Sequence, residues 1–195
     1  TSGRTSTNAA LINSNNSSSE NFVTFRNSLL RGGSYGIYTS GSSVGQERGW
    51  VVENCRILPY YRGIYMANNA GFTIHGNDII SNTFANYTSF TGIYLTSCDS
   101  IQAITSNYIN ADGGIYGMYF SGVTNYMGNP ALIANNMIHS GGSGSSRGIY
   151  ITSSSAQLDF YHNTINVTST SSIARSIDFA SSATDSVRLI NNIFA

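Results

Sequence analysis

The six aspartates are the side chains of this 195-residue sequence best suited to acid–base chemistry. Two facing carboxylates could hydrolyse a glycosidic bond, and carboxylates grouped with backbone carbonyls could bind Ca²⁺. No two of them hold equivalent positions in neighbouring copies of the repeat described below. We therefore predict no catalytic residue, no metal site and no cofactor, with a weak Ca²⁺ site as the alternative. The six are Asp78, Asp99, Asp112, Asp159, Asp178 and Asp185.

The histidines and cysteines are also candidates for chemistry. His75, His139 and His162 could bind a metal ion, but His75 and His162 lie three repeats apart, roughly 15 Å in a stacked structure. We expect turn histidines. Cys55 and Cys98 fall at different corners of the repeat, which favours free thiols and leaves a disulfide as the alternative.

A Gly-Ile-Tyr motif recurs through the chain. Met118 replaces the isoleucine in one copy, and the last copy is a degenerate Ser176-Ile177-Asp178. The central residues of successive copies are separated by 27, 29, 25, 31 and 28 residues. Side chains alternate along a strand, so apolar central residues pointing inward turn the tyrosines outward. The expected column comprises Tyr38, Tyr65, Tyr94, Tyr119 and Tyr150.

This tyrosine column has two interpretations. Stacked rings would stiffen a parallel sheet. Alternatively, a flat aromatic strip would bind sugar rings or a partner protein. Three arginines stand two residues before the inward-pointing position and could lie along the edge of the tyrosine strip: Arg62, Arg147 and Arg175.

A second motif, an Asn between two apolar residues, keeps the same period of roughly 28. Asn tolerates the left-handed backbone conformation that a sharp bend needs. Stacked amides could also hydrogen-bond to one another as a ladder. The asparagines assigned to this turn are Asn27, Asn54, Asn77, Asn107, Asn136, Asn163 and Asn192.

Short alternating strands separated by Gly, Ser and Asn clusters surround both motifs, and no segment has the apolar stripe of a helix. This pattern predicts an all-β parallel β-helix, a solenoid of about seven coils with an Asn ladder at one turn. Residues 1–195 form a single domain, which we expect to be a fragment of a longer chain. The expected core is Val52, Ile64, Ile74, Ile93, Ile104, Met118, Ile133, Ile149, Phe160, Ile177 and Leu189.

The pattern resembles the right-handed parallel β-helix repeat of the pectate-lyase-like superfamily from about residue 8 onward. Asn163-Thr164-Ile165-Asn166 and the closing Asn191-Asn192-Ile193-Phe194-Ala195 look especially like β-helix segments of large secreted surface proteins of Bacteroidetes. The resemblance implies right-handedness and type IX secretion. It also implies O-glycosylation of Ser100 and Ser186, which stand in Asp-Ser-apolar sequences.

The composition limits the classes of molecule that we expect the protein to bind. Only 9% of residues are charged, the formal net charge is zero, and Lys is absent, so nucleic acid is not an expected partner. No apolar run is long enough for membrane insertion. With 22 Asn, 31 Ser and 17 Thr, the chain is expected to be extracellular or on a bacterial cell surface.

The predicted function is a non-enzymatic structural or adhesive segment of an exported cell-surface protein. The alternative is a polysaccharide-binding or polysaccharide-degrading β-helix protein. Thr1 to Asn8 are short and polar, and Ile193 and Phe194 complete a repeat motif, so neither end of the solenoid has an expected cap. We expect each end to meet further chain or a partner protein.

Overall fold

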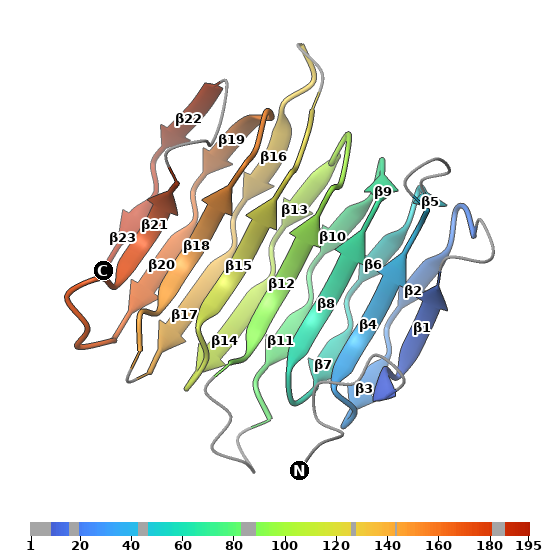
Figure 1. The fold of residues 1–195 in the computed structure, drawn as a ribbon, viewed down its shortest axis with the longest axis horizontal. Helices are drawn as coiled ribbons and strands as arrows, with labels where there is room; N and C mark the ends of the chain where they lie inside the picture. Colours follow the sequence, from blue (N-terminus) through green and yellow to red (C-terminus); the bar gives the residue numbers. More distant parts are fainter. Residues whose placement is uncertain are drawn as a thin grey trace.

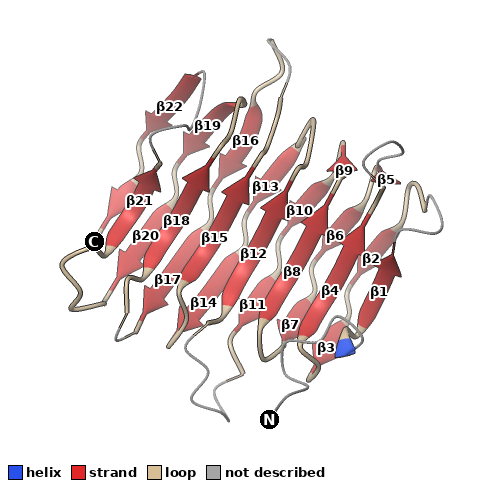
Figure 2. Ribbon diagram, in the orientation of Figure 1, coloured by secondary structure: helices blue, strands red, loops and turns tan. Residues whose placement is uncertain are grey.

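The computed structural model of the protein describes residues 9–15, 20–42, 47–82, 89–125, 128–142, 144–180 and 186–195. These residues form a stack of short strands in three parallel sheets, seven strands in each (Figure 1). Figure 2 shows strands along the whole described chain and one short helical turn near its N-terminal end. The predicted all-β class is therefore confirmed.

The three sheets follow one another in every coil. Sheet A contains β1 (Ile12–Asn15), β4 (Tyr35–Ser40), β8 (Arg62–Ala67), β12 (Thr91–Thr96), β15 (Tyr116–Ser121), β18 (Arg147–Thr152) and β21 (Arg175–Phe179). Sheet B contains β2 (Thr24–Arg26), β6 (Val51–Glu53), β10 (Thr73–His75), β13 (Ala103–Thr105), β16 (Ala131–Ala134), β19 (Gln157–Tyr161) and β22 (Ser186–Ile190). Sheet C contains β3 (Leu29–Arg31), β7 (Arg56–Leu58), β11 (Asp78–Ile80), β14 (Tyr108–Asp112), β17 (Met137–Gly141), β20 (Thr164–Val167) and β23 (Ile193–Phe194). A fourth, two-stranded sheet joins β5 (Glu47–Arg48) and β9 (Asn69–Ala70) at a corner.

Each strand of the inner coils pairs in parallel with its counterparts one coil before and one coil after. In sheet A the register runs from Ile12 through Ile37 and Ile64 and continues to Ile177. Ile12 and Ile177 are six layers apart, which gives about 28 residues per coil. The predicted period and the seven stacked layers are confirmed.

The inward-facing residues of the three sheets form one continuous core. Nine of the eleven predicted core residues are fully buried, from Val52 to Phe160. Ile177 is only partly buried, and Leu189 is 46% exposed, so the prediction is wrong for Leu189. The reason is position: both residues belong to the last described coil, and no described strand stacks on them.

The glycines of the Gly-Ile-Tyr motif are explained by packing. A Cβ added to Gly92 would lie 2.4 Å from Ile109 Cγ2 and 2.7 Å from the Gly117 carbonyl oxygen. An added Cβ would meet an isoleucine of sheet C and the backbone of the next coil in the same way at Gly36, Gly63, Gly117 and Gly148. The core side chains of sheet C thus press against bare backbone in sheet A, and no side chain fits between them.

This packing yields a stability test. We expect Gly92→Ala to lower the free energy of unfolding by about 1–3 kcal/mol, because the methyl group overpacks the core. Gly144→Ala is the matched control, since its Cβ would meet no atom within 4 Å. Urea unfolding followed by the fluorescence of the single, buried Trp50 measures both. Equal effects of the two substitutions would contradict the packing explanation.

Candidate functional site

The turn between sheet B and sheet C has two residues in every coil. The first forms the bend, and the second forms the ladder. The first has a left-handed backbone in all seven coils, with φ between 52° and 65°. It is Asn27, Asn54, Gly76, Ser106, Asn135, His162 and Asn191 in order. All seven asparagines assigned to this turn lie in it, but Asn27 and Asn54 hold its first position, one residue before the position that carries the ladder.

The second turn residue carries the ladder, in an unbroken run of asparagines from Asn77 to Asn192. Asn136 is representative: its Nδ2 donates to Ile104 O at 2.8 Å and to Asn163 Oδ1 at 2.9 Å. Its Oδ1 accepts from the backbone N and from Nδ2 of Asn107 at 3.1 and 2.9 Å. Ser28 and Cys55 occupy this position in the first two coils, so the amide ladder begins at Asn77.

The outer face of sheet A carries the five motif tyrosines as one column. Tyr38 and Tyr65 stack with ring centroids 4.9 Å apart and planes 5° from parallel. Tyr65 and Tyr94 follow at 5.3 Å and 28°, and Tyr94 and Tyr119 at 4.5 Å and 32°. Tyr119 and Tyr150 tilt more, at 5.5 Å and 55°. The ring faces of the middle tyrosines are therefore turned toward each other along the solenoid.

Arg62 sits within the first half of this face. Its guanidinium carbon lies 3.7 Å from the Tyr94 ring centroid, 4.6 Å from that of Tyr61 and 5.1 Å from that of Tyr65. Nη2 donates to the Tyr61 hydroxyl at 3.1 Å, whereas the buried Nε has no hydrogen-bond partner. Among the described residues Arg62 belongs to no ion pair.

Close packing changes the acidity of these tyrosines. Burial is the main cause that raises the pKa of Tyr65 to about 12, with a further contribution from Tyr38. Burial also raises the pKa values of Tyr94 and Tyr116, against the opposing charges of Arg62 and Arg147. Tyr65, Tyr94 and Tyr116 are thus weaker acids than an ordinary tyrosine, which disfavours their use as phenolate nucleophiles.

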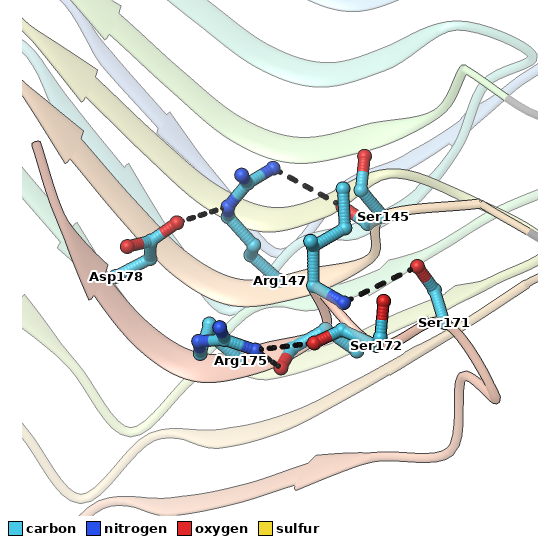
Figure 3. A network of polar contacts seen from close by, with 8 residues as sticks. Ser145, Arg147, Ser171, Ser172, Arg175 and Asp178 are labelled. Atoms are coloured by element: carbon cyan, nitrogen blue, oxygen red, sulfur yellow. Dashed lines mark hydrogen bonds and ion pairs between the residues drawn. The ribbon is translucent and has the colours of Figure 1, made fainter.

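The second half of the face ends in an ion pair (Figure 3). Arg147 lies over the Tyr150 ring at 4.3 Å, pairs with Asp178 through Nε, and donates to Ser145 O at 3.2 Å. Arg175, predicted to edge the strip, turns instead to its own loop and donates to Ser172 O and Ala174 O. Asp178 continues the tyrosine column by register with Tyr150.

Of the remaining candidates for chemistry, Asp112 and His139 lie near each other at Gly141: a Cβ added to this glycine would be 3.4 Å from Asp112 Oδ1 and 3.5 Å from His139 Nε2. Asp159 on sheet B is bound by Arg188, whose hydrogen bonds lower the pKa of this carboxyl, while Asp78 lies on sheet C. His75 Nδ1 contacts Thr105 Oγ1 at 2.8 Å, and His162 forms a turn. Asp185 lies outside the described residues, as does the Thr1–Asn8 stretch. Within the described part of the chain, no three His, Cys, Asp or Glu residues are grouped to hold a metal ion.

Comparison with known families decides the classification. The sequence matches the profile described as "Right handed beta helix region" over residues 5–194, almost the whole chain. The chain belongs to the right-handed β-helix family. No significant match was found among curated proteins or among solved structures. Family membership fixes the handedness of the solenoid and leaves the activity of this β-helix open.

One polar cluster of this β-helix was not predicted. Glu47, fully buried at a corner after sheet A, accepts hydrogen bonds from Ser14 Oγ at 2.7 Å and from Thr39 Oγ1 at 2.5 Å. Thr39 also contacts Asn69 Oδ1 at 2.9 Å. These residues come from neighbouring coils and share no sequence motif, so only the stacking brings them together.

The two cysteines of the β-helix are free and buried at different corners, as predicted. Burial raises the pKa of the Cys98 thiol to about 12. Of the two predicted O-glycosylation sites, Ser186 is exposed, whereas Ser100 is half-buried and its hydroxyl donates to Asp99 Oδ1. No helix in the described residues is long and apolar enough to cross a membrane.

The ladder and the bend can be separated by substituting adjacent residues. Asn136→Gly removes four buried hydrogen bonds, so we expect it to lower the free energy of unfolding by about 3 kcal/mol or more. Asn135→Gly keeps the left-handed turn, where φ is 56°, and should change stability by less than about 1 kcal/mol. Urea unfolding compares the two, and similar losses would contradict the division of roles.

The tyrosine face also predicts a pH dependence. Between pH 10 and about 12 the folded protein keeps the Tyr65 proton that the unfolded chain releases, so stability should fall as pH rises through this window. Cys98 contributes with the same sign above its ordinary value of 9.0. Urea midpoints measured from neutral to alkaline pH should fall less steeply in Tyr65→Phe. An unchanged slope in this variant would refute the assignment to Tyr65.

Proposed function

We propose that this β-helix is a non-enzymatic structural or adhesive segment of an exported cell-surface protein. The observation that carries the proposal is the geometry of the tyrosine column. Tyr38, Tyr65 and Tyr94 stack face to face at 4.9 and 5.3 Å, close to the spacing of the strands themselves. A sugar-binding platform needs ring faces open to solvent, whereas these rings cover one another. The column therefore favours a role in stiffening the solenoid.

The pairing of the carboxylates supports the same proposal. Asp159 and Asp178, the aspartates on the outer faces of sheets B and A, are bound by Arg188 and Arg147. Hydrogen bonds from Arg188 lower the pKa of Asp159, so this carboxyl stays ionised and is a poor general acid. Glycoside hydrolysis normally needs one carboxyl that keeps its proton and a second that does not.

The proposed location outside the cell rests on the composition. The chain is rich in Ser, Thr and Asn, with only 9% charged residues and no Lys. The proposal includes modification of the exposed Ser186 in preference to Ser100.

A second candidate function, polysaccharide binding, is favoured by Arg62. This cation lies among tyrosine rings and belongs to none of the ion pairs of the described residues. A guanidinium that forms no ion pair among the described residues and lies beside phenolic hydroxyls suits the carboxylate or sulfate of an acidic sugar. Such a ligand would contact the edges of the rings rather than their faces.

A stability measurement tests the stiffening role. Tyr94→Ala removes two ring contacts and the Arg62 cation–π contact, so we expect a loss of about 2–4 kcal/mol in the free energy of unfolding. Tyr108→Ala is the control: Tyr108 lies on the outer face of sheet C with no ring contact among the described residues, and should cost less than about 1 kcal/mol. Equal losses would argue against a structural role for the column.

Incubation with a panel of neutral and acidic polysaccharides tests the function itself. The scaffold proposal expects neither cleavage nor retention. Retention of acidic polysaccharide that is lost in Arg62→Gln would establish the binding alternative. Newly formed chain ends would establish degradation and overturn the proposal.

A further inference from the structure

Gly141 interrupts a column of outward-facing side chains on sheet C. It ends β17 and pairs in register with Asp112 one coil earlier. One coil later the chain continues to Thr168, whose backbone N donates to Ser140 O at 3.0 Å. His139, for which the sequence predicted a turn, stands on β17 two residues before Gly141 and therefore faces the same side. Side chains of three successive coils thus surround a position that has no side chain of its own.

The atoms around this position are polar. Apart from its chain neighbours, the nearest heavy atoms to a Cβ added at Gly141 would be Thr168 Oγ1 at 2.4 Å, Asp112 Oδ1 at 3.4 Å and His139 Nε2 at 3.5 Å. At Gly92, by comparison, an added Cβ would meet an isoleucine side chain and backbone. Among the described glycines, only Gly141 has its three nearest atoms on three different polar side chains.

The three side chains are accessible to a ligand. Asp112 and Thr168 are exposed and His139 is half-buried, so solvent reaches them from outside the solenoid. Among the described residues, no hydrogen bond or ion pair involves the polar side-chain atoms of these three residues. His75 differs, because its Nδ1 contacts Thr105 Oγ1 at 2.8 Å. The imidazole, carboxylate and hydroxyl at Gly141 therefore have binding capacity that the described protein does not use.

The backbone that carries these side chains is held in place. Asp112 N donates to Asn110 Oδ1 at 3.1 Å, and Gly114 N donates to Ala111 O at 2.8 Å, which closes a turn around Asp112. His139 is fixed by the parallel pairing of β17 with β14, where it lies in register with Asn110. The donor groups thus stand on backbone that the stacking positions, which favours a defined site over chance proximity.

We propose that Asp112, His139 and Thr168 form a binding site for a divalent transition-metal ion such as Zn²⁺. An imidazole nitrogen and a carboxylate oxygen are ordinary zinc ligands at about 2.0–2.2 Å from the ion, whereas Ca²⁺ and Mg²⁺ prefer oxygen ligands alone. Rotation of the exposed Asp112 and Thr168 side chains brings their oxygens to bonding distance, and water completes the coordination. This inference goes beyond the proposed function and does not depend on it.

A bound ion would join three successive coils of the solenoid. Its ligands come from the end of β14, from β17 and from the residue after β20, and only the folded chain brings them together. An ion that binds the folded chain and not the unfolded chain stabilises the fold by mass action. Zn²⁺ should therefore raise the urea midpoint of the protein.

Isothermal titration calorimetry with ZnCl₂ on the 195-residue chain tests the site. The wild-type protein should bind one ion per chain with a saturable isotherm, and the urea midpoint should rise over the same Zn²⁺ concentrations. His139→Gln and Asp112→Asn should each weaken binding by at least about tenfold, because each removes a ligand or its charge. His75→Gln is the control: this histidine lies on sheet B, and its substitution should leave the affinity unchanged.

Filling the glycine position gives a test that removes no ligand. Gly141→Ala places a methyl group among the three donor atoms and should also weaken binding by at least about tenfold, whereas Gly144→Ala, whose Cβ would meet no atom within 4 Å, should not. Circular dichroism and the fluorescence of Trp50 establish that each variant is folded, and Thr168→Val replaces Gly141→Ala if that variant unfolds. No saturable binding by the wild-type protein, unchanged affinity in His139→Gln, or an equal loss in His75→Gln would each overturn the proposal.

Discussion

The in-register parallel stacking of coils is the constraint on which the rest of the structure depends. Backbone hydrogen bonds hold each strand at one register against its neighbours, as Ile93 is held between Ile64 and Met118. Every position in the coil therefore meets the same position of the next coil at about 4.8 Å. The sequence repeats because each column selects one kind of side chain: isoleucine in the core, glycine against sheet C, asparagine at the turn and tyrosine outside.

The same constraint explains the low charge of the protein. A column of like charges at strand spacing would repel at every step, whereas hydroxyls, amides and phenols can stack or bond to their own kind. Three ion pairs of the described residues join opposite charges one coil apart, such as Arg26 with Glu53 and Asp159 with Arg188. Arg147 and Arg175, by contrast, are like charges in register. Arg62 belongs to none of the ion pairs of the described residues and lies among tyrosine rings instead.

The same tyrosine rings cannot both stack on one another to stiffen the sheet and offer their faces to a ligand. A ring that covers its neighbour stabilises the sheet but no longer offers its face to a ligand. Tilting increases along the column, from 5° between Tyr38 and Tyr65 to 55° between Tyr119 and Tyr150. The column of motif tyrosines is therefore most regular at its N-terminal end. Toward Arg147 and Asp178 the Tyr116 ring stacks with both Tyr119 and Tyr150, and an ion pair takes the place of the next ring.

The sequence by itself determined the solenoid, its period, its inward residues and the outward tyrosines, because strand alternation and repeat spacing are local properties of the chain. It did not separate the two turn residues: Asn27 and Asn54 resemble Asn77 in type, and only the backbone reveals that they form the bend while the next residue forms the ladder. Nor could it orient the tyrosine rings or find Glu47 among Ser14 and Thr39. These features were decided by the tertiary structure, because they depend on which atoms of successive coils face one another once the register is set.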